Sequence, residues 1–247
     1  MTAQLRAELL RQRSTRTNLG LFSAMFGLVV LVMLLHGLGL PAESLSRRSN
    51  QLAVIGQGQR LGTLFAALLG AISMTVEFRH GTIRPMFLTT PQRGRVVMAK
   101  VGVSMLIGIS FGLIATAAAV GVGSAALAAR GLEVRLDGGD YALLLGGSAV
   151  GAALWAAIGV GLGALVRNQV PTVVGICTWL LFVEGLLFGD IGLSDYGRFL
   201  PGSLAKAASG QDPQTLVAPG LAVLLLALYA AAAAAVGWVA TTRRDVP

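Results

Sequence analysis

The sequence predicts an all-α polytopic membrane protein with six transmembrane helices, and three observations support this fold class. Of its 247 residues, 55% are hydrophobic and only 12% are charged, whereas soluble proteins carry about 25% charged residues. The apolar residues gather in long runs that approach or exceed the roughly 20 residues a helix needs to cross a bilayer. The charged residues lie mainly between these runs. We therefore expect one transmembrane domain over residues 1–247.

The chain is expected to begin with an interfacial helix over residues 2–16. In this segment Met1, Leu5 and Leu9 fall on one helical stripe, whereas Arg6 and Arg13 lie elsewhere. An apolar stripe opposite basic residues is typical of a helix lying in the membrane surface. An unstructured basic tail is the alternative, and we favour the helix.

Six spans are predicted after this helix. The first carries no formal charge and is too long for the apolar core of a cleaved signal peptide. A polar loop is expected over 41–60, and the second span is short enough to begin a few residues early. The third run is longer than one crossing requires, so its helix must tilt or project from the membrane. The predicted spans are residues 19–40, 59–76, 96–128, 141–166, 170–188 and 216–240.

The distribution of Lys and Arg predicts the orientation of the chain. An even number of spans puts both termini on one side, and the segments on that side hold 12 of the 19 basic residues. Short loops rich in Lys and Arg stay in the cytoplasm. We therefore expect a multi-pass protein of the cell membrane with both termini cytoplasmic.

The most basic loop, the coupling segment 77–95 between spans 2 and 3, carries the features of a short capped helix. Gly81 would end the preceding helix, and Thr82 can cap a new one. Pro85 is tolerated in a first turn, where its missing N–H costs nothing. This predicts a cytoplasmic helix over about 83–89 that could dock a partner. A plain solvated loop is an equal alternative on these physical grounds.

The stretch between spans 2 and 3 holds a distinctive set of residues: Glu77, Gly81, Thr82, Ile83, Arg84, Thr90, Pro91, Arg93 and Lys100. This pattern resembles the signature that follows the second span in membrane subunits of type-2 ABC transporters, the exporter-type permeases. It departs from the family pattern at Gln92, where the family has Arg. A second, weaker similarity is Phe199-Leu200-Pro201, before the last span.

The resemblance implies an exporter built from two membrane halves and two separate nucleotide-binding subunits. The second half would be another copy of this chain or a homologous permease, and ATP and Mg²⁺ would bind on the ATPase subunits. ATP binding would draw the docking helices together and shift the pathway between inward and outward openings. The residues expected to face the ATPase are Glu77, Arg79, Gly81, Thr82, Arg84, Met86, Phe87, Leu88, Pro91 and Arg93.

The sequence lacks the motifs that would make the chain an enzyme. A phosphate-binding loop needs Gly-Lys-[Ser/Thr], but the two lysines, Lys100 and Lys206, each follow an alanine. The lone Cys177 and the absence of a His-Glu-x-x-His motif leave no expected metal site. The net charge of +8 does not indicate nucleic acid, because the basic residues adjoin apolar runs. We expect a transport subunit without its own cofactor, with membrane lipids as its surroundings.

Glu184 is the one formal charge inside a predicted span, in the run WLLFVEGLLFGD. Such residues usually face the interior of a bundle or water. Glu184 could line the translocation pathway or act as a gate, or it could be an interface carboxylate near a helix end. The sequence favours the second interpretation.

Two other functions remain open. A stand-alone proton-coupled secondary transporter or channel could use Glu184, and a membrane anchor or assembly factor would transport nothing. The spans lack the charged or aromatic clusters expected of a site for a polar ligand. This favours a lipophilic cargo such as a drug, an antibiotic or a lipid.

Glycines four residues apart recur within the predicted spans. Small residues at this spacing let helix backbones approach closely. With 33 glycines in the chain, such pairs also arise by chance. The pairs are Gly108/Gly112, Gly147/Gly151 and Gly159/Gly163.

Overall fold

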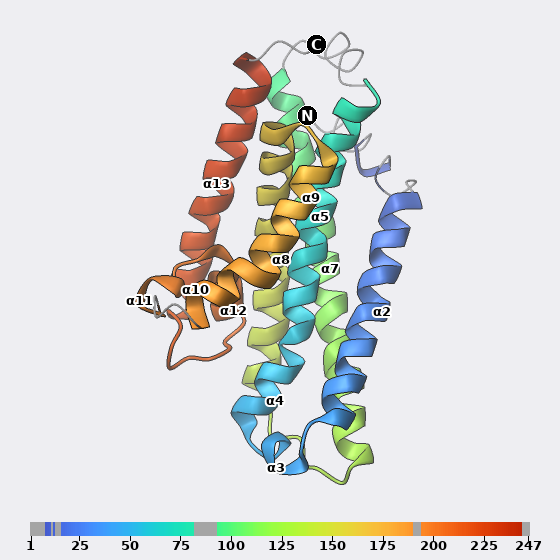
Figure 1. The fold of residues 1–247 in the computed structure, drawn as a ribbon, viewed down its shortest axis with the longest axis vertical. Coiled ribbons are helices and arrows are strands. Elements are labelled where there is room, and N and C mark those ends of the chain that lie inside the picture. The colour runs from blue at the N-terminus through green and yellow to red at the C-terminus, as the bar shows by residue number, and fades with distance from the viewer. Residues whose placement is uncertain (1–7, 11, 13–15, 82–92, 190–193, 244–247) are drawn as a thin grey trace.

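The computed structural model is a bundle of helices, and it describes residues 8–10, 12, 16–81, 93–189 and 194–243. No strand occurs among these residues. Figure 1 shows the long helices running side by side, with a group of short helices crossing beside them. The elements are α2 (Arg16–Gly39), α3 (Ala42–Leu45), α4 (Arg48–Ile55), α5 (Gln57–Arg79), α7 (Arg93–Ala129), α8 (Gly138–Val166), α9 (Gln169–Thr178), η1 (Trp179–Val183), α10 (Glu184–Gly189), α11 (Ser194–Gly197), α12 (Pro201–Ala208) and α13 (Pro219–Arg243).

The predicted fold class is confirmed: the chain is an all-α polytopic membrane protein. Within the part of the chain that the structure describes, six helical stretches are long and apolar enough to cross a membrane, and each overlaps one of the six predicted spans. The predicted interfacial helix is described only at 8–10 and 12, which are helical. The predicted coupling helix, residues 83–89, lies outside the described residues.

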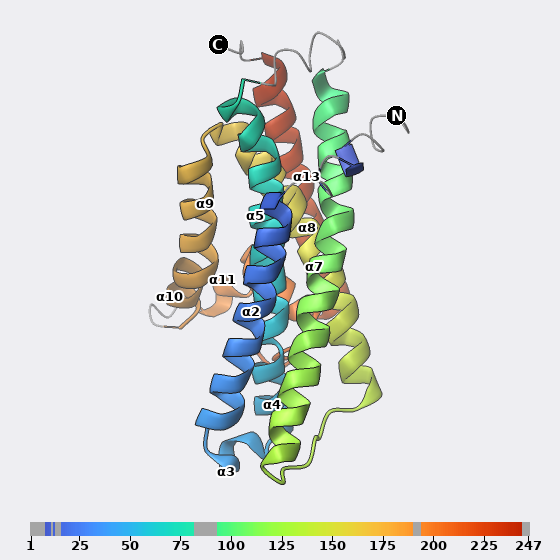
Figure 2. The same cartoon turned by 90° about the vertical axis from the view of Figure 1, so that its right-hand side faces the viewer.

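Helices α5 and α8 form the centre of the bundle. In the most apolar stretch of each of these two spans, about 72% of the residues are buried. In the other four spans this share is a third or less. Helices α7, α9 and α13 pack around this pair, and α2 covers α7 and α5 on the outside (Figure 2). The four outer helices keep apolar faces such as Leu35, Phe182 and Leu228 exposed, as expected for surfaces in contact with lipid.

Close contacts along both sides of α8 are confirmed for five of the six paired glycines, whereas Gly151 is at an ordinary contact distance. A Cβ added at Gly159 would lie 2.1 Å from the carbonyl oxygen of Ala67 in α5, and one at Gly112 in α7 would lie 2.3 Å from that of Ser148. A Cβ added at Gly147 would lie 2.2 Å from the carbonyl oxygen of Ala208 in α12. These distances are far below van der Waals contact, so the close approach of the helices requires glycine at these positions.

The predicted polar loop 41–60 is wrong, because most of this segment is helical. Helix α4 begins at Arg48 and leads directly into α5, which starts at Gln57. Leu52 and Ile55 are buried, and the Gln51 side chain donates hydrogen bonds to the carbonyls of Leu45 and Glu133, at 2.9 and 2.8 Å. These tertiary contacts stabilise a helix that the polar composition did not indicate.

The segment between spans 5 and 6 also contains a packed helix. Helix α12 packs against α8 and α13 and buries Leu204, Ala205 and Ala208. The Trp155 indole in α8 donates a hydrogen bond of 3.2 Å to the carbonyl of Pro201 at the start of α12. Helix α12 is therefore part of the protein core.

Candidate functional site

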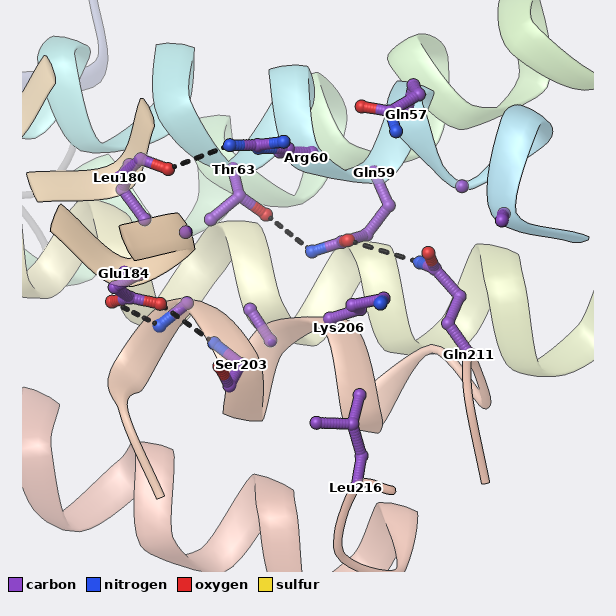
Figure 3. Close-up of a pocket in the computed structure, with 15 residues that line it drawn as sticks. Gln57, Gln59, Arg60, Thr63, Leu180, Glu184, Ser203, Lys206, Gln211 and Leu216 are labelled. Carbon is purple, nitrogen blue, oxygen red and sulfur yellow. Dashed lines mark hydrogen bonds between the residues drawn. The ribbon is translucent and has the colours of Figure 1, made fainter. Parts of the chain in front are cut away.

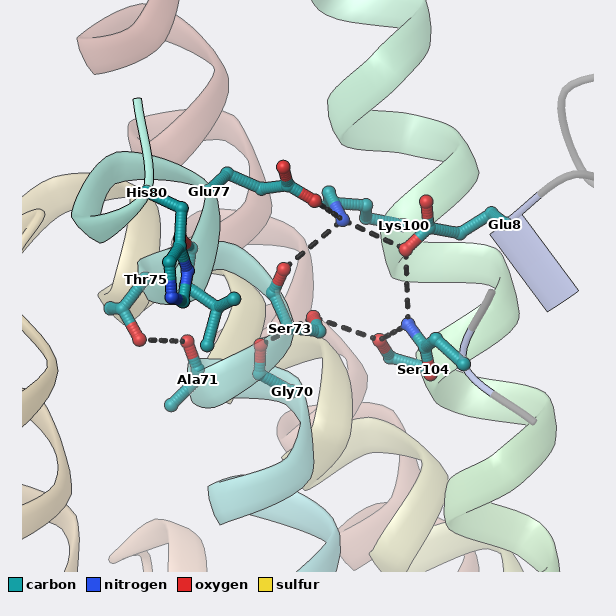
Figure 4. A network of polar contacts seen from close by, with 11 residues as sticks. Glu8, Gly70, Ala71, Ser73, Thr75, Glu77, His80, Lys100 and Ser104 are labelled. Carbon is teal, nitrogen blue, oxygen red and sulfur yellow. Dashed lines mark hydrogen bonds and ion pairs between the residues drawn. The ribbon is translucent and has the colours of Figure 1, made fainter. Parts of the chain in front are cut away.

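The end of the bundle that carries the signature residues contains a buried ion cluster. Lys100 in α7 places its Nζ 2.8 Å from Glu8 and 3.0 Å from Glu77 in α5. The side chains of Lys100 and Glu77 are only 2% and 1% exposed. The same ammonium donates to the backbone carbonyl of Ser73 at 3.0 Å (Figure 4). One cation therefore joins the N-terminal segment, α5 and α7.

A line of polar contacts extends the ion cluster further into the bundle. The Gln12 amide donates to Glu8 at 3.2 Å and lies 3.5 Å from the Ser104 hydroxyl, which in turn lies 3.4 Å from the hydroxyl of Ser73. Charges buried at this depth are costly unless they are paired and hydrogen-bonded. The network stabilises the ion cluster and orients the N-terminal segment against α5 and α7.

The structure separates the predicted ATPase-facing residues into different environments. Glu77 faces inward, with its side chain 1% exposed and its carboxylate 3.0 Å from the Lys100 ammonium. Its place at the ATPase interface stays a prediction. Arg79 is exposed and donates a 3.3 Å hydrogen bond to Gln169 at the start of α9. Gly81 is exposed with φ +65° and follows the end of α5, as its helix-breaking role predicted. Thr82, Arg84, Met86, Phe87, Leu88 and Pro91 lie outside the described residues, and Arg93 is the first residue of α7.

The second polar site surrounds Glu184 at the junction of η1 and α10. Glu184 is 7% exposed. Both interpretations of this residue, a pathway or gate residue and an interface carboxylate, stay predictions. Glu184 accepts hydrogen bonds from the backbone N–H groups of Gly202 and Ser203, at 2.9 and 3.0 Å, and from the Trp179 indole. Helix α12 has no side-chain cap of its own. Glu184 thus caps α12 from a distant segment, where the helix dipole favours a negative charge.

A cavity of about 220 Å³, with both polar and apolar residues in its lining, lies beside Glu184, between α5, η1 and α12. Figure 3 shows Arg60 entering it from α5 and Lys206 from α12. The Arg60 Nη2 donates to the carbonyls of Leu180 and Leu181 in η1, at 3.1 and 3.4 Å. This segment has π-helical geometry, and π-helical turns within α-helices are frequent at functional sites.

Amide side chains form one wall of the cavity. The Gln59 amide donates to the Thr63 hydroxyl at 3.0 Å, and the Gln211 amide donates to the Gln59 carbonyl oxygen at 3.2 Å. These contacts join α5 to the loop that follows α12. The arrangement can bind a polar group by hydrogen bonds and charge, but the described part of the chain has no group of His, Cys, Asp or Glu that could hold a metal ion.

Sequence reasoning missed the internal role of Lys100 and the participation of Arg60 and Lys206. Lys100 was counted with the basic loop, although it lies inside an apolar run that starts at Val96. A lysine in such a run is a signal that sequence alone provides, because a charge there requires a partner. Nothing local indicated that this partner would be Glu8, which is 92 residues away.

Comparison with known proteins adds no assignment: neither a protein-family model nor a curated protein matches this chain.

Proposed function

We propose that this chain is the membrane-spanning subunit of an ATP-driven type-2 ABC exporter. It would work in the cell membrane as a pair of membrane halves, formed by two copies or by this chain and a homologue. A separate nucleotide-binding subunit would bind ATP and Mg²⁺ and dock around residues 83–89 of the coupling segment 77–95. The cargo would be lipophilic.

The observation that carries the proposal is the ion pair between Glu77 and Lys100. These two signature residues lie on either side of the predicted docking helix, residues 83–89, in sequence and meet at 3.0 Å inside the bundle. The pair ties together the helix that precedes the segment and the helix that follows it. A docked ATPase that moved this segment would therefore move α5 and α7 together and transmit its motion to the bundle.

The position of the docking segment can be tested by labelling from either side of the membrane. In a Cys177→Ala background, Thr90→Cys should resist a membrane-impermeant thiol reagent in intact cells and react in inverted vesicles. Val134→Cys, in the exposed loop between α7 and α8, should show the opposite behaviour. Efficient labelling of Thr90→Cys from outside would reverse the topology and overturn the proposal.

The function itself can be tested by purifying the full chain with its partner from native membranes. We expect an ATPase to co-purify and ATP-dependent flux to appear in proteoliposomes. Phe87→Glu should abolish this flux while the protein still inserts and folds. Val134→Glu, a matched change at the opposite end of the bundle, should preserve it. Full activity of Phe87→Glu, or a purified chain that holds no ATPase, would contradict the proposal.

The rival function, a proton-coupled transporter, is supported by the burial of Glu184. A buried carboxylate within a span is the kind of group that carries protons. The rival predicts flux in vesicles that contain only this chain, driven by a proton gradient and abolished by Glu184→Gln. The ABC proposal predicts no flux in such vesicles.

A further inference from the structure

Among the residues that line the cavity between α5, η1 and α12, the exposed charged side chains are both cationic. Arg60 is exposed, and the Lys206 side chain is 41% exposed. The lining carboxylate, Glu184, is buried and already accepts three hydrogen bonds from Trp179, Gly202 and Ser203. A ligand entering the cavity therefore meets cationic side chains, whereas the Glu184 carboxylate is already hydrogen-bonded to α12 and to Trp179.

Hydrogen-bond donors accompany the two cations. Arg60 uses Nη2 for the carbonyls of η1, and a guanidinium carries five N–H donors in a planar fork that suits phosphate and carboxylate. Lys206 lies 3.6 Å from Asp212 in a half-exposed pair, and exposed pairs of this kind are weak. Both cations can therefore turn toward an anion, and Gln57 adds an amide to the same cavity.

The size and surroundings of the cavity restrict the kind of ligand. Pockets for whole drug-sized molecules occupy roughly 300–1,000 Å³, whereas this cavity measures about 220 Å³. It can hold a headgroup but not a large molecule. The adjoining surface of η1 and α10 is apolar, with Leu181, Phe182 and Leu186 exposed, and provides a place for an alkyl chain.

We propose that this cavity binds the anionic headgroup, a phosphate or carboxylate, of an amphipathic molecule whose apolar chain lies along η1 and α10. Arg60 and Lys206 bind the headgroup from opposite walls, and Glu184 holds α12 in place beside it. The inference deepens the proposed function, since such a molecule would be the cargo. Its test requires no ATPase, so a failure here and a failure of coupling are distinguishable.

The test measures binding of dodecyl phosphate to the purified full chain in an uncharged detergent by calorimetry. Dodecyltrimethylammonium provides the same chain with a cationic head, and inorganic phosphate provides the anion without a chain. We expect dodecyl phosphate to bind at least about tenfold more tightly than either, because both the charge-assisted hydrogen bonds and the apolar contact contribute.

Variants connect this binding to the cavity. Arg60→Gln combined with Lys206→Gln should weaken dodecyl phosphate binding about tenfold or more. Arg60→Lys combined with Lys206→Arg retains both charges and should restore most of the affinity, which separates loss of charge from loss of folding. Arg47→Gln combined with Arg135→Gln removes two exposed charges outside the cavity lining and should leave binding unchanged.

Three results would overturn the proposal. Equal affinity of the wild type and the Arg60→Gln, Lys206→Gln protein would show that these cations do not bind the headgroup. Equal affinity for dodecyltrimethylammonium would show that the site does not select anions. Equal affinity for inorganic phosphate would assign the cavity to a free anion instead of an amphiphile.

Discussion

Replacing Lys100 by methionine should destabilise this protein far more than the same change at its other lysine. Lys100→Met keeps the length of the side chain but removes the cation that contacts Glu8 at 2.8 Å and Glu77 at 3.0 Å. Removing one partner of a buried ion pair costs about 3–5 kcal/mol, because a buried charge loses its compensation. For a chain of this size, about 1 kcal/mol shifts the unfolding midpoint by about 2–4 °C. The expected shift is therefore about 6–20 °C downward.

Lys206→Met is the matched control. Its ammonium lies 3.6 Å from Asp212, and both side chains are 41% exposed. An exposed ion pair contributes about 0–1 kcal/mol, so the midpoint should fall by about 4 °C at most. The comparison removes the same functional group from a buried cluster and from a half-exposed pair.

Cys177 provides the assay. It is the only cysteine of the chain and packs against the core from α9, so its reactivity with a fluorogenic thiol dye should rise as the protein unfolds on heating. Adding Glu8→Gln and Glu77→Gln to Lys100→Met should recover part of the loss, because neutral amides do not require the cation. If Lys100→Met shifts the midpoint no more than Lys206→Met does, the ion cluster is not a source of stability and our reasoning is refuted.

Two further predictions each compare a closely packed glycine with a control glycine that faces open space. Gly147→Val should lower the unfolding midpoint through overpacking of about 1–3 kcal/mol against the α12 backbone, whereas Gly146→Val, which faces open space, should change it little in the same thermal assay. Gly202→Ala should weaken the hold of η1 on α12, because the added Cβ would lie 2.2 Å from the Glu184 carboxylate oxygen; we expect faster proteolysis between α10 and α13 than in Gly185→Ala, and equal rates would contradict this.

The helical spans were predictable from sequence because hydropathy over about 20 residues is a local property. The close glycine contacts were predictable for a similar reason, since small residues four apart form one face of a helix. The loop 41–60 was not, because its helices are stabilised by contacts such as that between Gln51 and Glu133, 82 residues apart. The composition of a segment shows that its side chains are polar, but not which distant residues will form hydrogen bonds with them.

The candidate sites divide in the same way. The basic segment 77–95 and the unusual position of Glu184 stand out in the sequence. The inward orientation of Glu77 does not, because a residue at a helix end can face either the solvent or the bundle. Arg60 was the last residue of an expected loop, and only the packing of η1 against α5 places it in a cavity with Lys206.

The sequence by itself determined that the chain is helical, that it crosses a membrane and where its basic loops lie, since each of these depends on runs of neighbouring residues. Tertiary structure alone decided which charged residues meet. Lys100 pairs with Glu8 across 92 residues, and Glu184 caps a helix that begins 17 residues later. The physical reason is that a buried charge must find a partner somewhere in the bundle, and the fold, not the order of residues, brings that partner within reach.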